Sequence, residues 1–335
     1  MQREERSPVR NYRLGIIGTG QIGSRHLQAL AMIDRPVSVQ VVDIIPDALR
    51  NAKERFNEMK GSGNVKHVDY LEDISEMFPE LDCVIVATTA DRRRKAIETL
   101  LREKHVDYLI LEKVLFQRRD DFRIIHTLLN QYDVKAWVNF SRRMWPIYRE
   151  LETKTKNTDF VSLNVTGSQW GLGCNGLHYL DLFAFLTHCT EITILSDSLD
   201  SKILTAKRQG FVEFTGALHY LNSKKNHLSM TSYPTGNAPL LVQITSPTSA
   251  FVVDENNGIA WISEDADGWK WHKKPFSIPY QSQLTHLVVQ KILDTGQCDL
   301  ASYDDSWKIH IPFLEALSAH LRKINYSEGD ICPIT

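Results

Sequence analysis

The chain has 335 residues, of which 42% are hydrophobic and 24% are charged, and its formal net charge is −2. A chain of this length exceeds what one hydrophobic core usually serves, so we expect two domains. The near-neutral charge excludes a general attraction of the whole molecule to nucleic acid or to an anionic membrane, and we expect neither as a partner.

Short apolar runs alternate with longer segments of helical period as far as Phe140. Strands are predicted at Leu14–Ile17, Val37–Val42, Val65–Val68, Cys83–Ala87, Tyr108–Leu111 and Val134–Val138. Helices are predicted between them at 21–33, 47–59, 72–78, 92–103 and 120–131. Continuously apolar strands that are separated by helices indicate a parallel sheet covered on both faces. Residues 1–140 are therefore predicted to form a doubly wound α/β domain of the dinucleotide-binding type.

The pattern changes beyond Phe140. Helices are predicted at 145–154, 177–187, 281–294 and 303–323, the last with a kink at Pro312. Strands are predicted at 160–167, 191–195, 211–220, 227–232, 240–245, 250–253 and 258–263. Neighbouring strands without intervening helices favour a mostly antiparallel, open sheet. Residues 141–335 are therefore predicted to form a second domain, of the α+β class.

The ends of the chain and its cysteines indicate the compartment. The N-terminal stretch MQREERSPVR is too charged to hold the apolar core of a signal peptide, and no apolar run is long enough to span a bilayer. The five cysteines are scattered and form no C-x-x-C pair, so neither a disulfide framework nor a metal site is indicated. We expect a cytoplasmic protein with reduced thiols.

The segment LGIIGTGQIGSRH, residues 14–26, holds the first functional signal. Gly18, Gly20 and Gly23 follow a predicted strand and precede a predicted helix, and Asp43 closes the next apolar run. In a dinucleotide site the first glycine makes the turn, the second lets the backbone approach the pyrophosphate, and the third lets the helix pack on the strand. The helix N-terminus at Gln21 would offer N–H groups to the phosphates. The alternative is a structural turn that binds nothing.

Asp43 indicates which coenzyme such a site prefers. A carboxylate at this point would accept hydrogen bonds from the adenosine ribose and repel a 2′-phosphate, which favours NAD over NADP. The same side chain could instead cap the helix that begins near Pro46. The residues predicted to contact the cofactor are Gly18, Gly20, Gln21, Ile22, Gly23, Asp43, Thr88 and Glu112.

Two later segments carry candidate catalytic groups. LILEKV places Glu112 and Lys113 at the C-terminal end of a predicted parallel strand, where ligands bind in open α/β sheets. A lysine there can stabilise negative charge on a substrate oxygen, although a lone lysine is commonly a surface residue paired with a carboxylate. GLGCNGLHYLDLF, residues 171–183, places His178 and Asp181 on one face of a helix. A histidine suits proton exchange with an alcohol, or is a structural core residue.

Taken together, these motifs resemble the Gfo/Idh/MocA oxidoreductases, relatives of glucose-fructose oxidoreductase and inositol dehydrogenase. GTGQIG, Asp43, EKV for the usual E-K-P, VNFSRRMWPIYREL (138–151) and G-x-H-x-x-D occur in the family's order, and the resemblance runs from about Leu14 to Leu321. It implies an N-terminal Rossmann domain and a C-terminal domain (141–335) that binds substrate and whose open sheet forms the interface of a homodimer or homotetramer.

The resemblance also implies a reaction, which is hydride transfer between the nicotinamide C4 and a carbon of a sugar or polyol. Lys113 would then be the substrate-binding and catalytic lysine, and His178 the general acid/base. Two positions depart from the family's pattern. Val114 replaces the proline after E-K, and Cys174 stands four residues before the histidine, where relatives that use a Lys-Asp-His set have Asp. Asn175 or Asp181 could orient His178 in place of that Asp.

The stretch ADRRRKAIETLL suggests the kind of substrate. Its residues 92–95 are four cations in the first turn of a predicted helix, where they oppose the helix dipole and one another. An anionic substrate, such as a sugar acid, a phosphosugar or a nucleotide-activated sugar, would compensate them, and so would solvent or acidic neighbours. Trp170 could stack on a sugar ring or belong to the core. The predicted substrate-binding residues are Arg93, Arg142, Trp170, Asn175 and Asp181.

Three functions fit these features. The first is an NAD-dependent dehydrogenase that acts on a secondary alcohol of a sugar derivative. The second is a glycosidase or epimerase in which NAD is transiently reduced and then regenerated. The third is a dinucleotide-binding regulator without catalysis, which the loss of a carboxylate at Cys174 and of a proline at Val114 would suit, while the presence of Lys113 and His178 argues against it.

Overall fold

The computed structural model describes residues 10–326 and 331–335. The chain packs into two compact units. The first consists of residues up to Glu112 together with 124–139 and 279–300, and the second of 113–123, 140–278 and the residues from Ala301 on. No helix within the described ranges is long and apolar enough to cross a membrane. The division of labour between residues 1–140 and 141–335 stays a prediction.

The first unit is built on a parallel sheet. Its strands are β1 (Tyr12–Ile17), β2 (Val37–Val42), β3 (Val65–Leu71), β4 (Glu80–Val86), β5 (His105–Leu111) and β6 (Lys135–Val138). They pair in the order β6-β5-β4-β1-β2-β3, and every pairing is parallel. The apolar runs of the central strands are buried, as a sheet covered on both faces requires. The doubly wound fold is thus confirmed.

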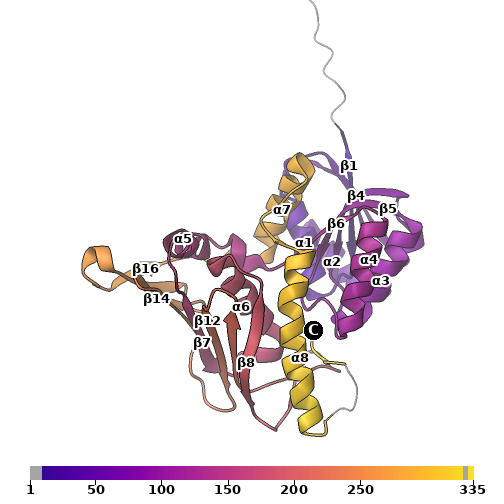
Figure 1. Cartoon of the computed structure of the whole chain (residues 1–335). Helices are drawn as coiled ribbons and strands as arrows, with labels where there is room; N and C mark the ends of the chain where they lie inside the picture. The colour runs from indigo at the N-terminus through magenta and orange to yellow at the C-terminus, as the bar shows by residue number, and fades with distance from the viewer. Residues whose placement is uncertain (1–9, 327–330) are drawn as a thin grey trace, which may run out of the picture. The chain divides into compact units, whose positions relative to one another are not determined.

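Helices cover both faces of this sheet (Figure 1). They are α1 (Gln21–Leu30), α2 (Pro46–Asn57), α3 (Ala90–Glu103), α4 (Arg119–Gln131) and α7 (Gln281–Thr295), of which α7 packs beside α1. The predicted helix at 72–78 is wrong, because the structure has only the 3-10 turn η1 (Ile74–Glu76) there. Asp73 and Glu76 cap that turn, and the proline that follows Phe78 disfavours helical geometry at its end.

The second unit is built on a mostly antiparallel sheet. Its strands are β7 (Ser162–Ser168), β8 (Ile192–Leu199), β11 (Gly216–Asn222), β12 (His227–Tyr233), β13 (Leu241–Thr245), β14 (Ser249–Asp254), β15 (Ile259–Glu264) and β16 (His272–Pro275). The order is β16-β15-β14-β13-β7-β12-β11-β8, with β7 and β12 the one parallel pair of this sheet. The predicted open sheet is confirmed, and buried and partly exposed residues alternate along β7, β12 and β13.

The strand predicted at 211–220 is divided in two. β10 (Val212–Glu213) pairs with β9 (Leu204–Thr205), and β11 starts only at Gly216, whose φ of +100° is a conformation that favours glycine. The remaining short elements are η2 (Ser141–Met144), η3 (Asp265–Asp267) and β17 (Ala301–Ser302). The division places Glu213 in the two-residue strand β10, which contacts α6, rather than in one long strand of the large sheet.

The helices of the second unit are α5 (Pro146–Thr155), α6 (Leu172–Thr187) and α8 (Tyr303–Lys323). α6 and α8 pack on each other and against strands of the antiparallel sheet (Figure 1). α8 continues through Pro312. α6 begins at Leu172, before the start predicted at residue 177, because Gly171 adopts a left-handed φ of +80° and the helix starts directly after it. Cys174 therefore lies in the first turn of α6.

Candidate cofactor and catalytic site

The glycine loop joins β1 to α1 and is closed by contacts that a side chain would prevent. The N–H of Gly18 donates to the carbonyl of Val42 over 2.8 Å, and the φ of Gly18 is +90°. A Cβ on Gly23 would lie 1.8 Å from the carbonyl oxygen of Gly18. Both positions therefore require glycine, Gly18 for its backbone conformation and Gly23 for the close approach of the helix.

The N-terminus of α1 is open in front of this loop. A Cβ on Gly20 would meet no atom within 4 Å, and Gly20, Gln21 and Ile22 are all exposed. Among the residues that the structure describes, no side chain caps the helix at Gly20. The first N–H groups of α1 are thus available to an external acceptor, and a helix N-terminus favours an anion.

Asp43 follows β2 and organises the loop. Its Oδ2 accepts hydrogen bonds from the backbone N–H of Thr19 over 2.6 Å and from the Thr19 hydroxyl over 3.0 Å. Its Oδ1 accepts from the N–H of Ile45 over 3.0 Å, while α2 begins after Ile45 without a side-chain cap. Asp43 therefore does not cap α2. The carboxylate is partly exposed, so it can also accept hydrogen bonds from a ligand.

Thr88 lies against the same loop. A Cβ on Gly18 would be 2.8 Å from the backbone nitrogen of Thr88. The Thr88 hydroxyl oxygen is buried and has no hydrogen-bond partner among the residues that the structure describes. A buried polar atom without a partner is uncommon and marks a place where a ligand or a water molecule binds.

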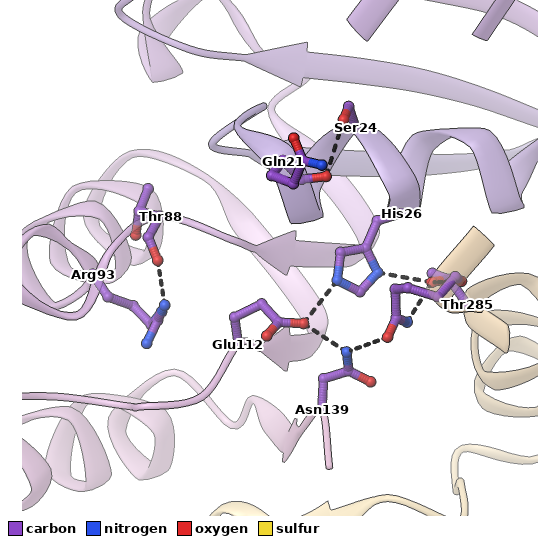
Figure 2. Close-up of polar contacts among 9 residues, drawn as sticks. Gln21, Ser24, His26, Thr88, Arg93, Glu112, Asn139 and Thr285 are labelled. Atoms are coloured by element: carbon purple, nitrogen blue, oxygen red, sulfur yellow. Dashed lines mark hydrogen bonds and ion pairs between the residues drawn. The ribbon is translucent and has the colours of Figure 1, made fainter. Parts of the chain in front are cut away.

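Arg93 does not suit the substrate role predicted for it. Its side chain lies in α3, is only 1% exposed and donates a hydrogen bond to the carbonyl of Thr88 (Figure 2). Of the neighbouring cations, Arg94 pairs with Glu98 over 3.0 Å, Arg92 lies 3.9 Å from an adjacent aspartate, and Lys95 is exposed to solvent. Acidic neighbours and solvent thus suffice to compensate these charges.

Glu112 directly follows β5 and is a member of a closed ring of hydrogen bonds (Figure 2). Its Oε1 lies 3.0 Å from Nε2 of His26 and accepts from Nδ2 of Asn139 over 2.6 Å. Asn139 also donates to Gln281 over 2.9 Å, and Gln281 donates to the Thr285 hydroxyl over 2.9 Å. That hydroxyl lies 2.8 Å from Nδ1 of His26, which completes the ring.

Each member of the ring contributes a donor or an acceptor. Nε2 of His26 and the amide of Asn139 both contact Oε1 of Glu112, and the amide of Asn139 donates both of its protons within the ring. Because α1, α7 and the residue that follows β5 each contribute a member, the ring fixes Glu112 relative to the glycine-loop helix. No sequence pattern indicated that Gln281 and Thr285 would join the site.

Lys113 is the first residue of the second unit and is held by α6. Its Nζ donates to the carbonyl oxygen of Cys174 over 3.0 Å and lies 3.4 Å from the Cys174 sulfur. The lysine is partly exposed, so its ammonium group can also reach a ligand. The Lys113–Val114 peptide bond is cis.

Glu213 is a carboxylate near Lys113 that the sequence analysis missed. It comes from β10 and accepts hydrogen bonds from the backbone N–H groups of Gly173 over 2.8 Å and of Cys174 over 3.0 Å. Burial raises the pKa of Glu213 above its ordinary value, while the backbone donors and the Lys113 ammonium oppose that rise. No motif surrounds this residue, and it reaches the site through tertiary packing alone.

His178 is placed to remain neutral. Its ring is partly exposed and packs edge-on against Phe140, with the ring centroids 5.8 Å apart. Its Nδ1 is buried and has no hydrogen-bond partner among the described residues. Burial lowers the pKa of His178 well below its usual value, and the positive charges of Arg142 and Lys113 lower it further. A neutral imidazole can accept a proton from an alcohol.

Neither residue suggested as an orienting partner of His178 forms a hydrogen bond with it in the described structure. The side-chain amide of Asn175 donates to the carbonyl of Trp170 over 2.8 Å. Asp181 is fully buried and pairs with Arg143 over 2.8 Å, so it holds that arginine rather than facing a ligand. The Trp170 indole donates to the carbonyl of Thr231 over 2.8 Å, and the ring remains partly exposed.

Arg142 also has a structural partner. Its guanidinium binds both carboxylate oxygens of Glu255, over 2.8 and 2.6 Å, and both side chains are largely buried. The hydroxyl groups of Tyr148 and Tyr179 donate to the same carboxylate. Burial alone would raise the pKa of Glu255, but its attraction to Arg142 and these hydrogen bonds outweigh burial and hold the pKa below its ordinary value. Arg142 therefore anchors η2 to the residue that follows β14, and a role of Arg142 in substrate binding stays a prediction.

Comparison with known proteins bears on the first unit most directly. The model of an oxidoreductase family with an NAD-binding Rossmann fold, Gfo/Idh/MocA, matches residues 12–140. Myo-inositol 2-dehydrogenase from Thermotoga maritima is 26% identical over 145 residues, which span 43% of this chain. The match covers 41% of that enzyme, so the chain spans about two fifths of the length of its curated relative.

Solved structures share the fold over most of the chain. UDP-N-acetylglucosamine 3-dehydrogenase from Acidithiobacillus ferrooxidans is 12% identical, with a TM-score of 0.67 over 92% of this chain and 97% of that one. Levoglucosan dehydrogenase in complex with NADH is 14% identical, with a TM-score of 0.69 over 94% and 98%. The 3-ketoreductase KijD10 from Actinomadura kijaniata, in complex with NADP, is 15% identical, with a TM-score of 0.65 over 90% and 95%.

The glycine loop provides a matched pair of substitutions. Gly23→Ala places a methyl group against the Gly18 carbonyl, so we expect the free energy of unfolding to fall by roughly 1–3 kcal/mol. Gly20→Ala meets no protein atom, so we expect the unfolding free energy to stay unchanged while NADH affinity falls. Calorimetric melting and NADH titration of both variants measure these effects. Equal loss of stability in the two variants would contradict the geometry of the loop.

A second pair of substitutions tests the buried ion pair. Glu255→Ala leaves the buried Arg142 without its counter-ion, so we expect a loss of about 3–5 kcal/mol of unfolding free energy. Glu264→Ala removes a partly exposed partner of Lys154 and should cost less than about 1 kcal/mol. Chemical denaturation of the two variants compares the losses.

The pH dependence of the same pair has a definite sign. Because the folded pKa of Glu255 lies below its unfolded value, its ionisation stabilises the fold above about pH 4.3. The difference between wild type and Glu255→Ala should therefore shrink as the pH falls further. A difference that is constant, or that grows in acid, is inconsistent with this assignment.

Proposed function

Because this chain belongs, through residues 12–140, to the Gfo/Idh/MocA oxidoreductase family with its NAD-binding Rossmann fold, we propose that it is an NAD-dependent dehydrogenase of a sugar derivative. The reaction is hydride transfer between the nicotinamide and a secondary alcohol carbon. The observation that carries the proposal is the open N-terminus of α1, with its glycine loop on one side and Asp43 on the other.

The residues of the first unit fit a dinucleotide. The uncapped N–H groups of α1 suit the pyrophosphate, and the space at Gly20 lets it approach the backbone. The buried Thr88 hydroxyl, beside the same loop, is a donor or acceptor in need of a partner. The bound nicotinamide supplies the hydride chemistry, and the chain supplies binding and orientation.

The coenzyme preference follows from charge at the end of β2. Asp43 presents a carboxylate where the ribose of the adenosine half would lie, and the next residues, Ile44 and Ile45, are apolar and exposed. No lysine or arginine occurs between Asp43 and Arg50, which itself pairs with Asp47. A 2′-phosphate would thus meet a negative charge without a cation to offset it, which supports NAD over NADP.

Lys113 and His178 have separate roles, one at the oxygen of the substrate and the other at its proton. The ammonium of Lys113 donates to the reacting oxygen of the substrate and stabilises the negative charge that develops as the hydroxyl proton leaves. His178, kept neutral by burial and by nearby cations, accepts that proton through its imidazole. Glu112 and Lys113 are consecutive residues, so the ring that fixes Glu112 also fixes the chain from which Lys113 starts.

The substrate class rests on the relatives. By name, they act on myo-inositol, on levoglucosan and on UDP-N-acetylglucosamine, which are polyols or sugar derivatives. The predicted preference for an anionic sugar loses its support from the arginine segment, because Arg93 is buried and Arg94 is paired. Neutral and nucleotide-activated sugars are therefore tested side by side.

The decisive experiment is turnover on a panel of neutral polyols, sugar acids and nucleotide sugars with NAD and with NADP. Steady accumulation of NADH with one substrate class is the expected result. Product formation without net accumulation of NADH would instead support a glycosidase or an epimerase in which NAD is reduced and then regenerated within each turnover. Tight NADH binding without turnover on any member of the panel would support a regulator and contradict the proposal.

Lys113→Ala tests the catalytic assignment. Loss of the ammonium should lower kcat by at least about a hundredfold while the Kd for NADH changes little. Lys156→Ala, at an exposed lysine of the same unit, is the control and should behave as wild type. Steady-state kinetics and calorimetric titration provide the two readouts. A kcat within a few-fold of wild type would show that another residue polarises the substrate oxygen.

A further inference from the structure

The first turn of α6 is stabilised by a residue from elsewhere in the unit. Gly171 precedes the helix and provides no side-chain cap. The carboxylate of Glu213 takes that place, since its two oxygens accept from the N–H groups of Gly173 over 2.8 Å and of Cys174 over 3.0 Å. These N–H groups have no partner within the helix, and a negative charge is favourable at a helix N-terminus.

The residue that Glu213 holds is the one that binds Lys113. The backbone of Cys174 donates its N–H to Glu213 and offers its carbonyl oxygen to Nζ of Lys113 over 3.0 Å. Its sulfur lies 3.4 Å from the same nitrogen. The position of the Lys113 acceptor therefore depends on the carboxylate of Glu213. The positive charge of Lys113 also attracts the Glu213 carboxylate and so opposes the rise that burial causes in the pKa of Glu213.

Glu213 is itself firmly placed. β10 pairs with β9, where Glu213 lies opposite Leu204, and the N–H of Val212 donates to the carbonyl of Pro333 over 2.9 Å. Gly173 permits the close approach, since a Cβ there would lie 3.1 Å from Oε2 of Glu213. A carboxylate that is fixed before the substrate arrives can orient a neighbouring group without reorganisation.

We propose that Glu213 is a positioning residue for the reaction, which holds the first turn of α6 so that Cys174 presents its carbonyl oxygen and thiol to the ammonium of Lys113. It also supplies the negative charge that a cysteine at position 174 does not. The inference rests on the proposed function, because the role of Lys113 is assigned there. Glu213 follows Cys174 by 39 positions, on another element, so no local motif reveals it.

A double-mutant cycle separates positioning from general stability. Glu213→Gln keeps the side-chain length but removes the charge and one acceptor, so kcat should fall by roughly ten- to a hundredfold while the Kd for NADH stays unchanged. In the Lys113→Ala background the same substitution should change kcat by less than about twofold, because the group that it positions is gone. Glu213→Asp, which retains the carboxylate, should recover part of kcat.

The control is Glu191→Gln, at an exposed glutamate of the same unit, which should match wild type. An unchanged kcat in Glu213→Gln overturns the proposal, and so does an equal loss in both backgrounds, which indicates a structural role only. A crystal structure of Glu213→Gln gives a readout independent of activity, in which Nζ of Lys113 should leave the carbonyl of Cys174. If wild type turns over no substrate, the proposed function fails, and retention or loss of this hydrogen bond still decides the role of Glu213.

Discussion

A buried carboxylate must be matched by hydrogen-bond donors, and the site of this protein is organised around that constraint at Glu112. The side chain is 7% exposed, and His26 and Asn139 both direct polar hydrogens at one of its oxygens. Thr285 and Gln281 complete the ring, so that a change in any member leaves another polar group without its partner. The position of Glu112, directly after β5, is fixed within the first unit as a consequence.

In the second unit the carboxylate of Glu213 is partly buried, and its donors are the backbone N–H groups of Gly173 and Cys174. The ammonium of Lys113 contacts the carbonyl oxygen and the sulfur of Cys174. The negative charge belongs to Glu213, which accepts a hydrogen bond from the backbone N–H of Cys174 in α6. Among the described residues, no carboxylate forms a hydrogen bond with His178, and burial together with Arg142 and Lys113 keeps its pKa low. The proposed chemistry therefore relies on a histidine that is neutral before the reaction and on a charged lysine that stabilises the alcohol oxygen as it becomes negative.

The sequence predicted the elements whose conformation depends on neighbouring residues in the chain. The parallel strands follow from continuous apolar runs, and the glycine loop follows from close approaches at Gly18 and Gly23 that no side chain allows. The start of α6 was placed too late, because its first turn is polar and glycine-rich and is stabilised by Glu213 from another element. The arginines of α3 suggested an anionic substrate, yet Arg93 is buried and donates to the carbonyl of Thr88.

The rest of the site depends on residues that are distant in the sequence. Gln281 and Thr285 meet His26 only because α7 returns to pack beside α1, and Glu213 meets Cys174 only because β10 turns toward α6. No periodic pattern and no compositional feature of the sequence indicates either contact. Arg142 and Asp181 each have a buried partner of opposite charge, which no sequence pattern indicates.

Calorimetric titration of the wild-type protein with NADH, and in parallel with NADPH, tests the central claim most directly, because it needs no knowledge of the substrate. The open N-terminus of α1 and the carboxylate of Asp43 predict saturable binding of NADH at micromolar concentrations and weaker binding of NADPH. If neither coenzyme binds at millimolar concentrations, the glycine loop is a structural turn and the account is contradicted.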